Sequence, residues 1–206
     1  MIAHTTWLHR ALFPSMLWRM PGKKIYLTFD DGPHPTATPI VLDTLKRFGV
    51  RATFFLSGKN IAGNEHLVQR IVDEGHAIGI HAFTHTRALA FSKDRTLDEI
   101  RHTRELLLPF TRTPARLFRP PYGFFSGKTI AAAKELDCIL VMWSCLTGDF
   151  RQVPAESVVK TALHDLSGGS ILVYHDNDLT VRTIAEILTM TIPQIRARGF
   201  EFGAIR

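Results

Sequence analysis

The segment Thr28-Phe29-Asp30-Asp31-Gly32-Pro33-His34 directly follows the apolar run Ile25-Tyr26-Leu27. The apolar run predicts a buried strand, and Gly32-Pro33 ends it, because proline cannot donate to a sheet and glycine permits a sharp reversal. Asp30 and Asp31 therefore stand at a strand end, where two carboxylates are costly to desolvate without compensation. A metal ion would supply that compensation. Hydrogen bonds within an Asp-Asp-Gly turn would supply it as well, and the segment alone leaves both interpretations open.

Length and composition describe a globular protein with one domain. The chain has 206 residues, of which 45% are apolar and 21% charged, so it can bury a core and is neither disordered nor fibrous. Its net charge of +6 would suit an anionic partner, or simply keep the protein in solution. No run of basic residues exceeds Lys23-Lys24, so we expect no nucleic-acid partner.

Apolar runs alternate with segments of helical spacing along the whole chain. Such alternation, with strands that are continuous apolar runs, predicts a parallel sheet covered by helices. The expected fold class is therefore α/β, as a single domain in the form of a barrel or a distorted barrel. The expected strands are residues 24–29, 52–56, 77–80, 116–118, 138–144, 170–174 and 200–205, and the expected helices are residues 38–48, 67–75, 97–108, 128–136, 155–166 and 181–198.

Residues 1–22 precede this pattern and are expected to form an N-terminal strap or extension of the main domain, residues 23–206. The stretch 7–20 mixes Trp, Leu and Phe with His and Arg, so it could pack on one end of the domain or associate weakly with a membrane surface through residues 1–20. No apolar stretch is long enough to be a transmembrane segment, and no clear signal peptide is legible, which leaves the compartment unknown. We expect a monomer.

Cys138 and Cys145 flank an apolar segment and are expected to be buried thiols in or beside one strand, too far apart to bridge.

Polar residues with chemical capability follow the expected strands, one group after another. Because the carboxyl ends of parallel strands gather at one end of such a fold, these side chains are expected to converge there. The set consists of Asp30, Asp31, His81, His85, Arg119, Asp149, His175 and Asp176.

His81 and His85 are four residues apart, which lets two imidazoles converge on one ion from a compact loop. Joined to Asp31 from another strand end, they form a His-His-carboxylate set with open coordination positions. Such a set suits one divalent ion, Zn²⁺ above all, with Co²⁺ or another first-row ion as the alternative, and an open position would serve to activate water.

The order of the motifs resembles the polysaccharide deacetylases, the NodB-homology domain of carbohydrate esterase family 4. The resemblance runs from about residue 24 to residue 205, and it implies a distorted (β/α) barrel. It also implies a metal-dependent hydrolase that removes N-acetyl groups from an N-acetylhexosamine-containing glycan, of the chitin oligomer or peptidoglycan type. The matching motifs are Asp30-Asp31-Gly32, His81 with His85, Arg119-Pro120-Pro121-Tyr122-Gly123, Trp143 with Asp149, and Val173-Tyr174-His175-Asp176.

The same resemblance implies a role for each matching residue. Asp31, His81 and His85 would be the metal ligands. Asp30 would be the base that takes a proton from the attacking water, and Arg119 would hold Asp30 in place.

On the leaving-group side, the resemblance makes His175 the acid that protonates the departing amine, with Asp149 orienting it. The backbone N–H of Tyr122 would stabilise the oxyanion. The residues expected to shape an apolar pocket for the acetyl methyl are Trp143, Phe150 and Val173.

Three positions depart from the family pattern, and several functions stay open. Phe150 stands where the family usually has Trp, which exchanges one aromatic residue for another. Ile80 and Ala82 stand where the family commonly has polar residues, which could weaken metal binding and admits a non-catalytic glycan-binding relative. Another amide or ester substrate, such as a formyl- or acyl-sugar lipid or acetylated xylan, is a further alternative. Phe83, Phe124 and Phe125 lie on loops and are candidates for stacking on a sugar ring.

Overall fold

The structure, a computed structural model, describes residue 5 and residues 7–206. The strands are β1 (Ile25–Asp30), β2 (Thr53–Leu56), β3 (Ala77–Ile80), β4 (Leu117–Phe118), β5 (Ile139–Leu140), β6 (Cys145–Leu146), β7 (Ile171–His175) and β8 (Phe202–Gly203). The α-helices are α1 (Trp7–Leu12), α2 (Ala37–Phe48), α3 (Glu65–Asp73), α4 (Lys93–Leu107), α5 (Gly127–Glu135), α6 (Ala155–Leu163) and α7 (Ile184–Ala197). Three short 3₁₀ turns are η1 (Gly58–Asn60), η2 (Arg87–Phe91) and η3 (Pro121–Gly123).

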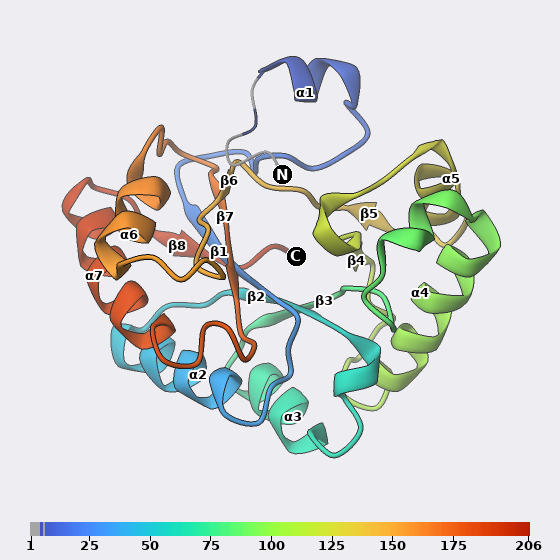
Figure 1. Cartoon of the computed structure of the whole chain (residues 1–206), viewed down its shortest axis with the longest axis horizontal. Helices are drawn as coiled ribbons and strands as arrows, with labels where there is room; N and C mark the ends of the chain where they lie inside the picture. The colour runs from blue at the N-terminus through green and yellow to red at the C-terminus, as the bar shows by residue number, and fades with distance from the viewer. Residues whose placement is uncertain (1–4, 6) are drawn as a thin grey trace.

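The strands form one curled parallel sheet in the order β5-β4-β3-β2-β1-β7-β6, with β8 added to β1. Helices α2 to α7 surround this sheet, and α1 lies apart from them (Figure 1). β5 and β6 end the sheet without pairing to each other, so the barrel is open at this seam. The predicted α/β fold, a distorted (β/α) barrel, is confirmed.

The register between β1 and β7 places the ends of these two central strands level with each other. Thr28 is opposite Val173, and Asp30 is opposite His175. Because the two strands are parallel, the two polar side chains that end them emerge at the same rim of the barrel.

Helix α4 begins at Lys93, four residues before the predicted start at residue 97. The first turn, Lys93 to Thr96, is polar and carries no apolar periodicity, which is why the pattern did not include it. Ser92 caps this turn, because its side chain accepts a hydrogen bond from the Arg95 N–H at 3.3 Å.

The predicted strand over residues 138–144 is too long, because only Ile139–Leu140 form β5 and a non-strand stretch separates them from β6. The carbonyls of Val141 and Met142 accept hydrogen bonds from the Arg119 guanidinium at 3.1 and 2.9 Å, a side-chain partner in place of a strand. The N–H of Met142 donates to the carbonyl of Leu17 at 2.8 Å. Because these backbone groups have hydrogen-bond partners outside the sheet, they do not need to pair with a neighbouring strand.

The N-terminal segment, in its described part, covers the open seam. Leu17 forms a parallel bridge with Val141, and its N–H donates to the Leu140 carbonyl at 2.8 Å. Trp18 is buried, whereas Trp7 on α1 is 71% exposed. Residues 1–4 and 6 lie outside the described residues, so the strap over residues 1–22 and its boundary with residues 23–206 stay predictions. Within the described part, no helix is both long and apolar enough to cross a membrane.

Cys138 and Cys145 form no disulfide, as predicted, but Cys138 is only partly buried and the two do not share a strand. Cys138 precedes β5, and Cys145 begins β6 on the other side of the break. Burial raises the pKa of the Cys145 thiol to about 12, so this side chain is an apolar filler at neutral pH.

Candidate active site

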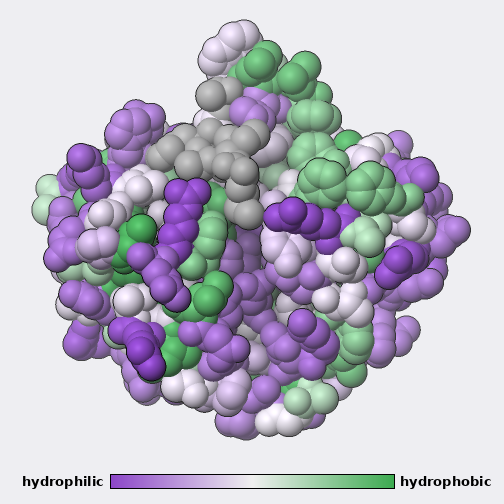
Figure 2. Space-filling model, viewed as in Figure 1, coloured by the Kyte–Doolittle hydropathy of each residue, from purple (hydrophilic) through white to green (hydrophobic). Residues whose placement is uncertain are grey.

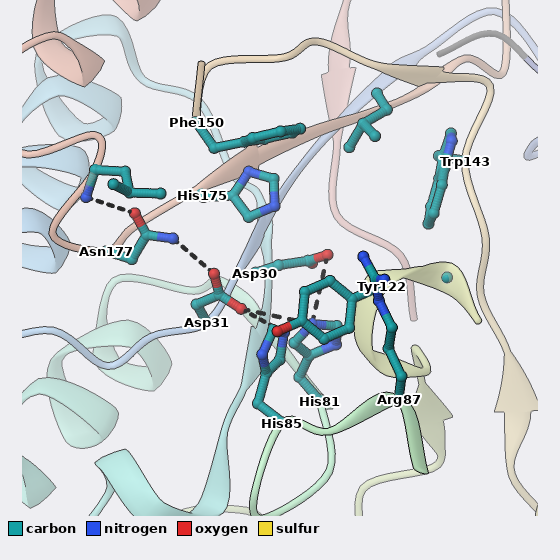
Figure 3. A pocket seen from close by; sticks show the side chains of 13 residues that line it. Asp30, Asp31, His81, His85, Arg87, Tyr122, Trp143, Phe150, His175 and Asn177 are labelled. Atoms are coloured by element: carbon teal, nitrogen blue, oxygen red, sulfur yellow. Dashed lines mark hydrogen bonds and ion pairs between the residues drawn. The ribbon is translucent and has the colours of Figure 1, made fainter. Parts of the chain in front are cut away.

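A cavity of about 260 Å³ opens where the strands end. The face of the molecule that carries it is hollowed near its middle (Figure 2), and Figure 3 shows the side chains that surround it. The cavity collects residues from five segments that are far apart in the sequence. They are Asp30, Asp31, His81, His85, Arg87, Tyr122, Gly123, Trp143, Leu146, Phe150, His175, Asn177 and Leu179.

Asp31, His81 and His85 converge at one side of this cavity, as the sequence predicts. One ligand-type atom from each lies within 4.8 Å of the others. The Oδ1 atom of Asp31 lies 3.0 Å from His85 Nε2 and 3.6 Å from His81 Nε2. That oxygen is buried and has no hydrogen-bond partner of acceptable geometry among the described residues. A buried carboxylate oxygen without a donor, facing two imidazoles, is what a divalent cation would satisfy.

The protonation states favour metal binding at this place. His81 Nδ1 lies 2.8 Å from the Arg119 carbonyl, which can only accept, so Nδ1 carries the proton and Nε2 presents its lone pair to the cavity. Burial lowers the pKa of His81 to about 4 and keeps it neutral. Burial opposes ionisation of Asp31, but the imidazoles of His85 and His81 outweigh it and hold the pKa of this carboxyl below its ordinary value.

The turn that aims Asp31 is fixed by Asp176, a buried carboxyl that the sequence placed among the strand-end residues without a role of its own. Asp31 itself has a φ of 82°, in the left-handed region. Asp176 accepts a hydrogen bond from the Gly32 N–H at 3.1 Å and another from the Thr38 hydroxyl at 2.5 Å. A Cβ on residue 32 would lie 2.2 Å from Asp176 Oδ2, so only glycine fits. Burial raises the pKa of Asp176 to about 8.

Asp30 is held by Arg119 at the floor of the cavity. Arg119 is fully buried, and its Nη1 lies 2.7 Å from Asp30 Oδ1. The other guanidinium hydrogens go to the Thr28 hydroxyl and to the carbonyls of Val141 and Met142, so the group has no freedom to turn away. The second oxygen of Asp30 stays directed toward His81, 3.9 Å from its Nε2. The contact expected between Arg119 and Asp30 is present.

His175 stands beside Asp30 and is held by Asp149. Nδ1 of His175 lies 2.8 Å from Asp149 Oδ1, and the backbone N–H of His175 donates to Oδ2 at 2.6 Å. With Nδ1 engaged, Nε2 is the atom available for proton exchange in the cavity. Burial disfavours the charged imidazole, but the Asp149 carboxylate outweighs it and raises the pKa of His175 to about 9.

The apolar side of the cavity contains most of the predicted pocket. Trp143 is buried and packs against Gly123, where a Cβ would lie 2.1 Å from the indole ring. The ring of Phe150 meets His175 edge-on, with centroids 5.1 Å apart. Val173 is fully buried in β7 and is not among the described residues that line the cavity; its neighbour in β6, Leu146, lines it instead.

Tyr122 stands at the mouth of the cavity, 40% exposed and with a φ of 59°. Its ring lies 4.6 Å from the ring of His85, measured between centroids.

The loop that carries the two histidines is held by a carboxylate. Glu99 of α4 accepts hydrogen bonds from the N–H groups of Phe83 and Thr84, at 2.7 and 2.6 Å. Ile80 and Ala82 are fully buried and contribute no polar side chain. Glu99 anchors the backbone of this loop from α4, and a search for strand-end residues does not find it.

Besides Leu146, the lining residues that were not predicted include Asn177, Arg87 and Leu179. Asn177 donates to Asp31 Oδ2 at 2.6 Å, as Figure 3 shows, and its place two residues after His175 was a usable signal. Arg87 and Leu179 lie on turns whose path no pattern in the sequence reveals.

Of the three aromatic residues expected to contact sugar, Phe83 stacks on His102 with centroids 4.1 Å apart. Phe125 packs edge-on against Phe13. Only Phe124 is largely exposed, at 45%, beside Phe91.

A family model described as "Polysaccharide deacetylase" matches residues 19–141, which include the metal-type triad and Arg119. The chain belongs to the polysaccharide deacetylase family. The resemblance seen in its motifs is thereby confirmed, and so is the predicted class of enzyme at the level of the family.

Named relatives of this family resemble the chain over most of its length. A Bacillus cereus peptidoglycan-N-acetylglucosamine deacetylase is 34% identical and covers 96% of the chain and 95% of the relative. The Listeria monocytogenes peptidoglycan-N-acetylglucosamine deacetylase PgdA is 36% identical over 89% of the chain, but the chain spans only 38% of that protein's length. A crystal structure of the peptidoglycan N-acetylglucosamine deacetylase Bc1960, in complex with 4-naphthalen-1-yl-N-oxidanyl-benzamide, has a TM-score of 0.90 and 30% identity, covering 98% of the chain and 95% of that structure.

Proposed function

We propose that the chain hydrolyses N-acetyl groups of an N-acetylhexosamine-containing glycan, with one divalent cation bound by Asp31, His81 and His85. The observation that carries the proposal is the buried Asp31 Oδ1, which has no hydrogen-bond partner of acceptable geometry among the described residues and faces two imidazoles. A cation bound there would act as a Lewis acid on the acetyl carbonyl and on water. The relatives named above support the glycan substrate.

Asp30 is proposed as the base for the attacking water. Arg119 engages Oδ1 of this carboxylate, so Oδ2 is the atom left to accept a proton on the cavity side. A charge-assisted contact to a guanidinium holds the carboxylate in one orientation.

His175 is proposed as the acid that delivers a proton to the departing nitrogen. An amine is a poor leaving group unless it is protonated as the C–N bond breaks. Asp149 holds the imidazole through Nδ1 and favours its charged form, so Nε2 carries a proton at neutral pH.

Tyr122, Trp143 and Phe150 are proposed to receive the acetyl group. The Tyr122 N–H would donate to the oxyanion, and the two aromatic rings would enclose the methyl group. Leu146 takes the place on this wall that was predicted for Val173.

The test is acetate release from N-acetylglucosamine oligomers, peptidoglycan fragments and acetylated xylan, each with and without chelator. Release from the first two that stops on chelation and returns with Zn²⁺ or Co²⁺ supports the proposal. Release from acetylated xylan alone would favour the ester alternative. Metal-independent binding of the oligomers without any release would favour a non-catalytic glycan-binding protein.

A further inference from the structure

The rim of the cavity carries one cationic side chain for which the proposed reaction has no use. Arg87 lines the same cavity as the metal-type triad and begins the turn η2, two residues after His85. Its guanidinium lies over the ring of Tyr122, with Cζ 4.6 Å from the ring centroid. In the view of Figure 3 the Tyr122 ring lies between His85 and Arg87.

The charge of Arg87 is not neutralised within the described part of the chain. Two carboxylates line the cavity, and both are engaged, Asp30 with Arg119 and Asp31 with the histidines. Glu99, the acid of the histidine loop, accepts hydrogen bonds from the backbone. No ion pair joins any described carboxylate to Arg87, so its positive charge is in excess at the mouth.

Arg87 is also oriented. The Thr86 hydroxyl accepts a hydrogen bond from the Ala88 N–H at 3.3 Å, which caps the turn, and the Ala90 carbonyl accepts from the Ser126 hydroxyl. Stacking on Tyr122 uses the flat face of the guanidinium, whereas its hydrogen-bond donors project from the edge. The edge therefore remains available for a planar or tetrahedral oxyanion.

We infer that Arg87 recognises an anionic substituent, a carboxylate or a phosphate, on the sugar that carries the acetamide or on the sugar next to it. The inference rests on the proposed deacetylation and deepens it, since it makes the preferred substrate an acidic glycan. The short path from His85 through Tyr122 to Arg87 places that anion close to the reacting group and not several sugars away. The net charge of +6 would favour the approach of such a glycan.

The experiment compares kcat/KM for matched oligomers that differ in one group. An N-acetylmuramic acid oligomer is compared with its methyl ester, which removes the carboxylate charge and keeps the shape. An N-acetylglucosamine oligomer is compared with its 6-phosphate. A preference for the charged member of one pair distinguishes carboxylate from phosphate as the natural group.

We expect the wild type to prefer a charged member by about tenfold, the effect of a charge-assisted contact at a partly exposed site. Arg87→Gln should reduce that ratio to about one, and Arg87→Lys should keep part of it, because lysine retains the charge without the planar fork. Arg112→Gln is the control, since Arg112 is exposed on the loop between α4 and β4 and its loss changes the net charge equally. For the wild type alone, the ratio should also fall as salt rises from about 0.05 M to about 0.5 M.

Three results would overturn the inference. One is a wild-type ratio of one for both pairs while acetate is still released, which leaves the proposed deacetylation standing. Another is an unchanged ratio in Arg87→Gln with both rates lowered equally, which would make Arg87 a positioning residue for Tyr122. The third is release from no oligomer at all, which would remove the proposed function as well.

Discussion

The floor and the rim of the cavity are built in opposite ways. At the floor, Arg119 is fully buried and Asp149 is 2% exposed, and each charge has a partner fixed by several hydrogen bonds. At the rim, Tyr122 and Leu179 are 40% and 58% exposed, and Arg87 has no ionic partner among the described residues. A buried charge is costly unless another group of the protein pairs with it, whereas an exposed charge is hydrated and remains available to bind a ligand. We therefore propose that the floor performs the chemistry and that the rim selects the substrate.

Removing the divalent cation is expected to have the largest effect, because the proposed chemistry at the floor requires a Lewis acid. Acetate release should fall by about three orders of magnitude or more with chelator and return with Zn²⁺ or Co²⁺. Asp31→Asn should weaken metal affinity by more than about 100-fold, measured as metal content after dialysis. Full activity in a preparation that retains no metal would refute the assignment of Asp31, His81 and His85.

The second-largest effect is expected from Asp30→Asn, because this substitution removes the proposed base and keeps the metal ligands. We expect kcat to fall by about 10²–10⁴-fold with metal content unchanged. The variant also leaves Arg119 buried without its anion, which should lower the free energy of unfolding by about 3–5 kcal/mol. Denaturant titration measures this loss, and kcat is then compared at a temperature where the variant is folded. If kcat were retained, Asp30 would not be the base.

The pH dependence tests whether the Asp149–His175 pair acts as one unit. The folded-state pKa of His175 is raised to about 9, so its proton is present at neutral pH and is lost as the pH rises through about 9. Activity should decline on that alkaline limb. The contribution of the Asp149–His175 pair to the free energy of unfolding is complete below pH about 6.5, the ordinary histidine pKa. It is lost as the pH rises from there through about 9, the pKa of His175 in the folded protein.

Asp149→Asn sharpens that test, because it removes the anion and leaves burial, which lowers the pKa of His175. The alkaline limb of kcat should then move to lower pH by more than about one unit, and kcat at neutral pH should fall about tenfold. If kcat declined over the same alkaline pH range in the wild type and in Asp149→Asn, a group other than His175 would be responsible for the decline.

A change at the rim should have the smallest effect. Leu179→Ala shortens a side chain that is 58% exposed, so we expect KM to rise by no more than about threefold with kcat and Tm unchanged. A loss in kcat as large as that of Asp30→Asn would contradict the division between floor and rim.

The sequence was a good guide to the floor, for a physical reason. Parallel strands bring their carboxyl ends together, so the strand pattern alone was enough to place Asp30, His81, Arg119 and His175 in one site. Strand and helix periods likewise predicted most elements, including β3 with its observed bounds.

Tyr122 apart, the rim and the seam could not be predicted, because both depend on contacts that a local pattern does not contain. Arg87 enters the cavity only because the turn η2 directs it there. The strand predicted over residues 138–144 is too long because the Val141 and Met142 carbonyls are taken by Arg119, and because Leu17 bonds to Met142 from far away in the sequence.

That seam connects the N-terminal segment to the proposed catalytic base through Arg119. Leu17 pairs with the same short stretch of backbone whose carbonyls clamp Arg119, and Arg119 in turn aims Asp30. Shortening the protein to begin at residue 23 would therefore do more than trim a tail. Val141 and Met142 would lose their backbone partner Leu17, and water could reach the buried guanidinium of Arg119. Asp30, the proposed base, would then be held less firmly.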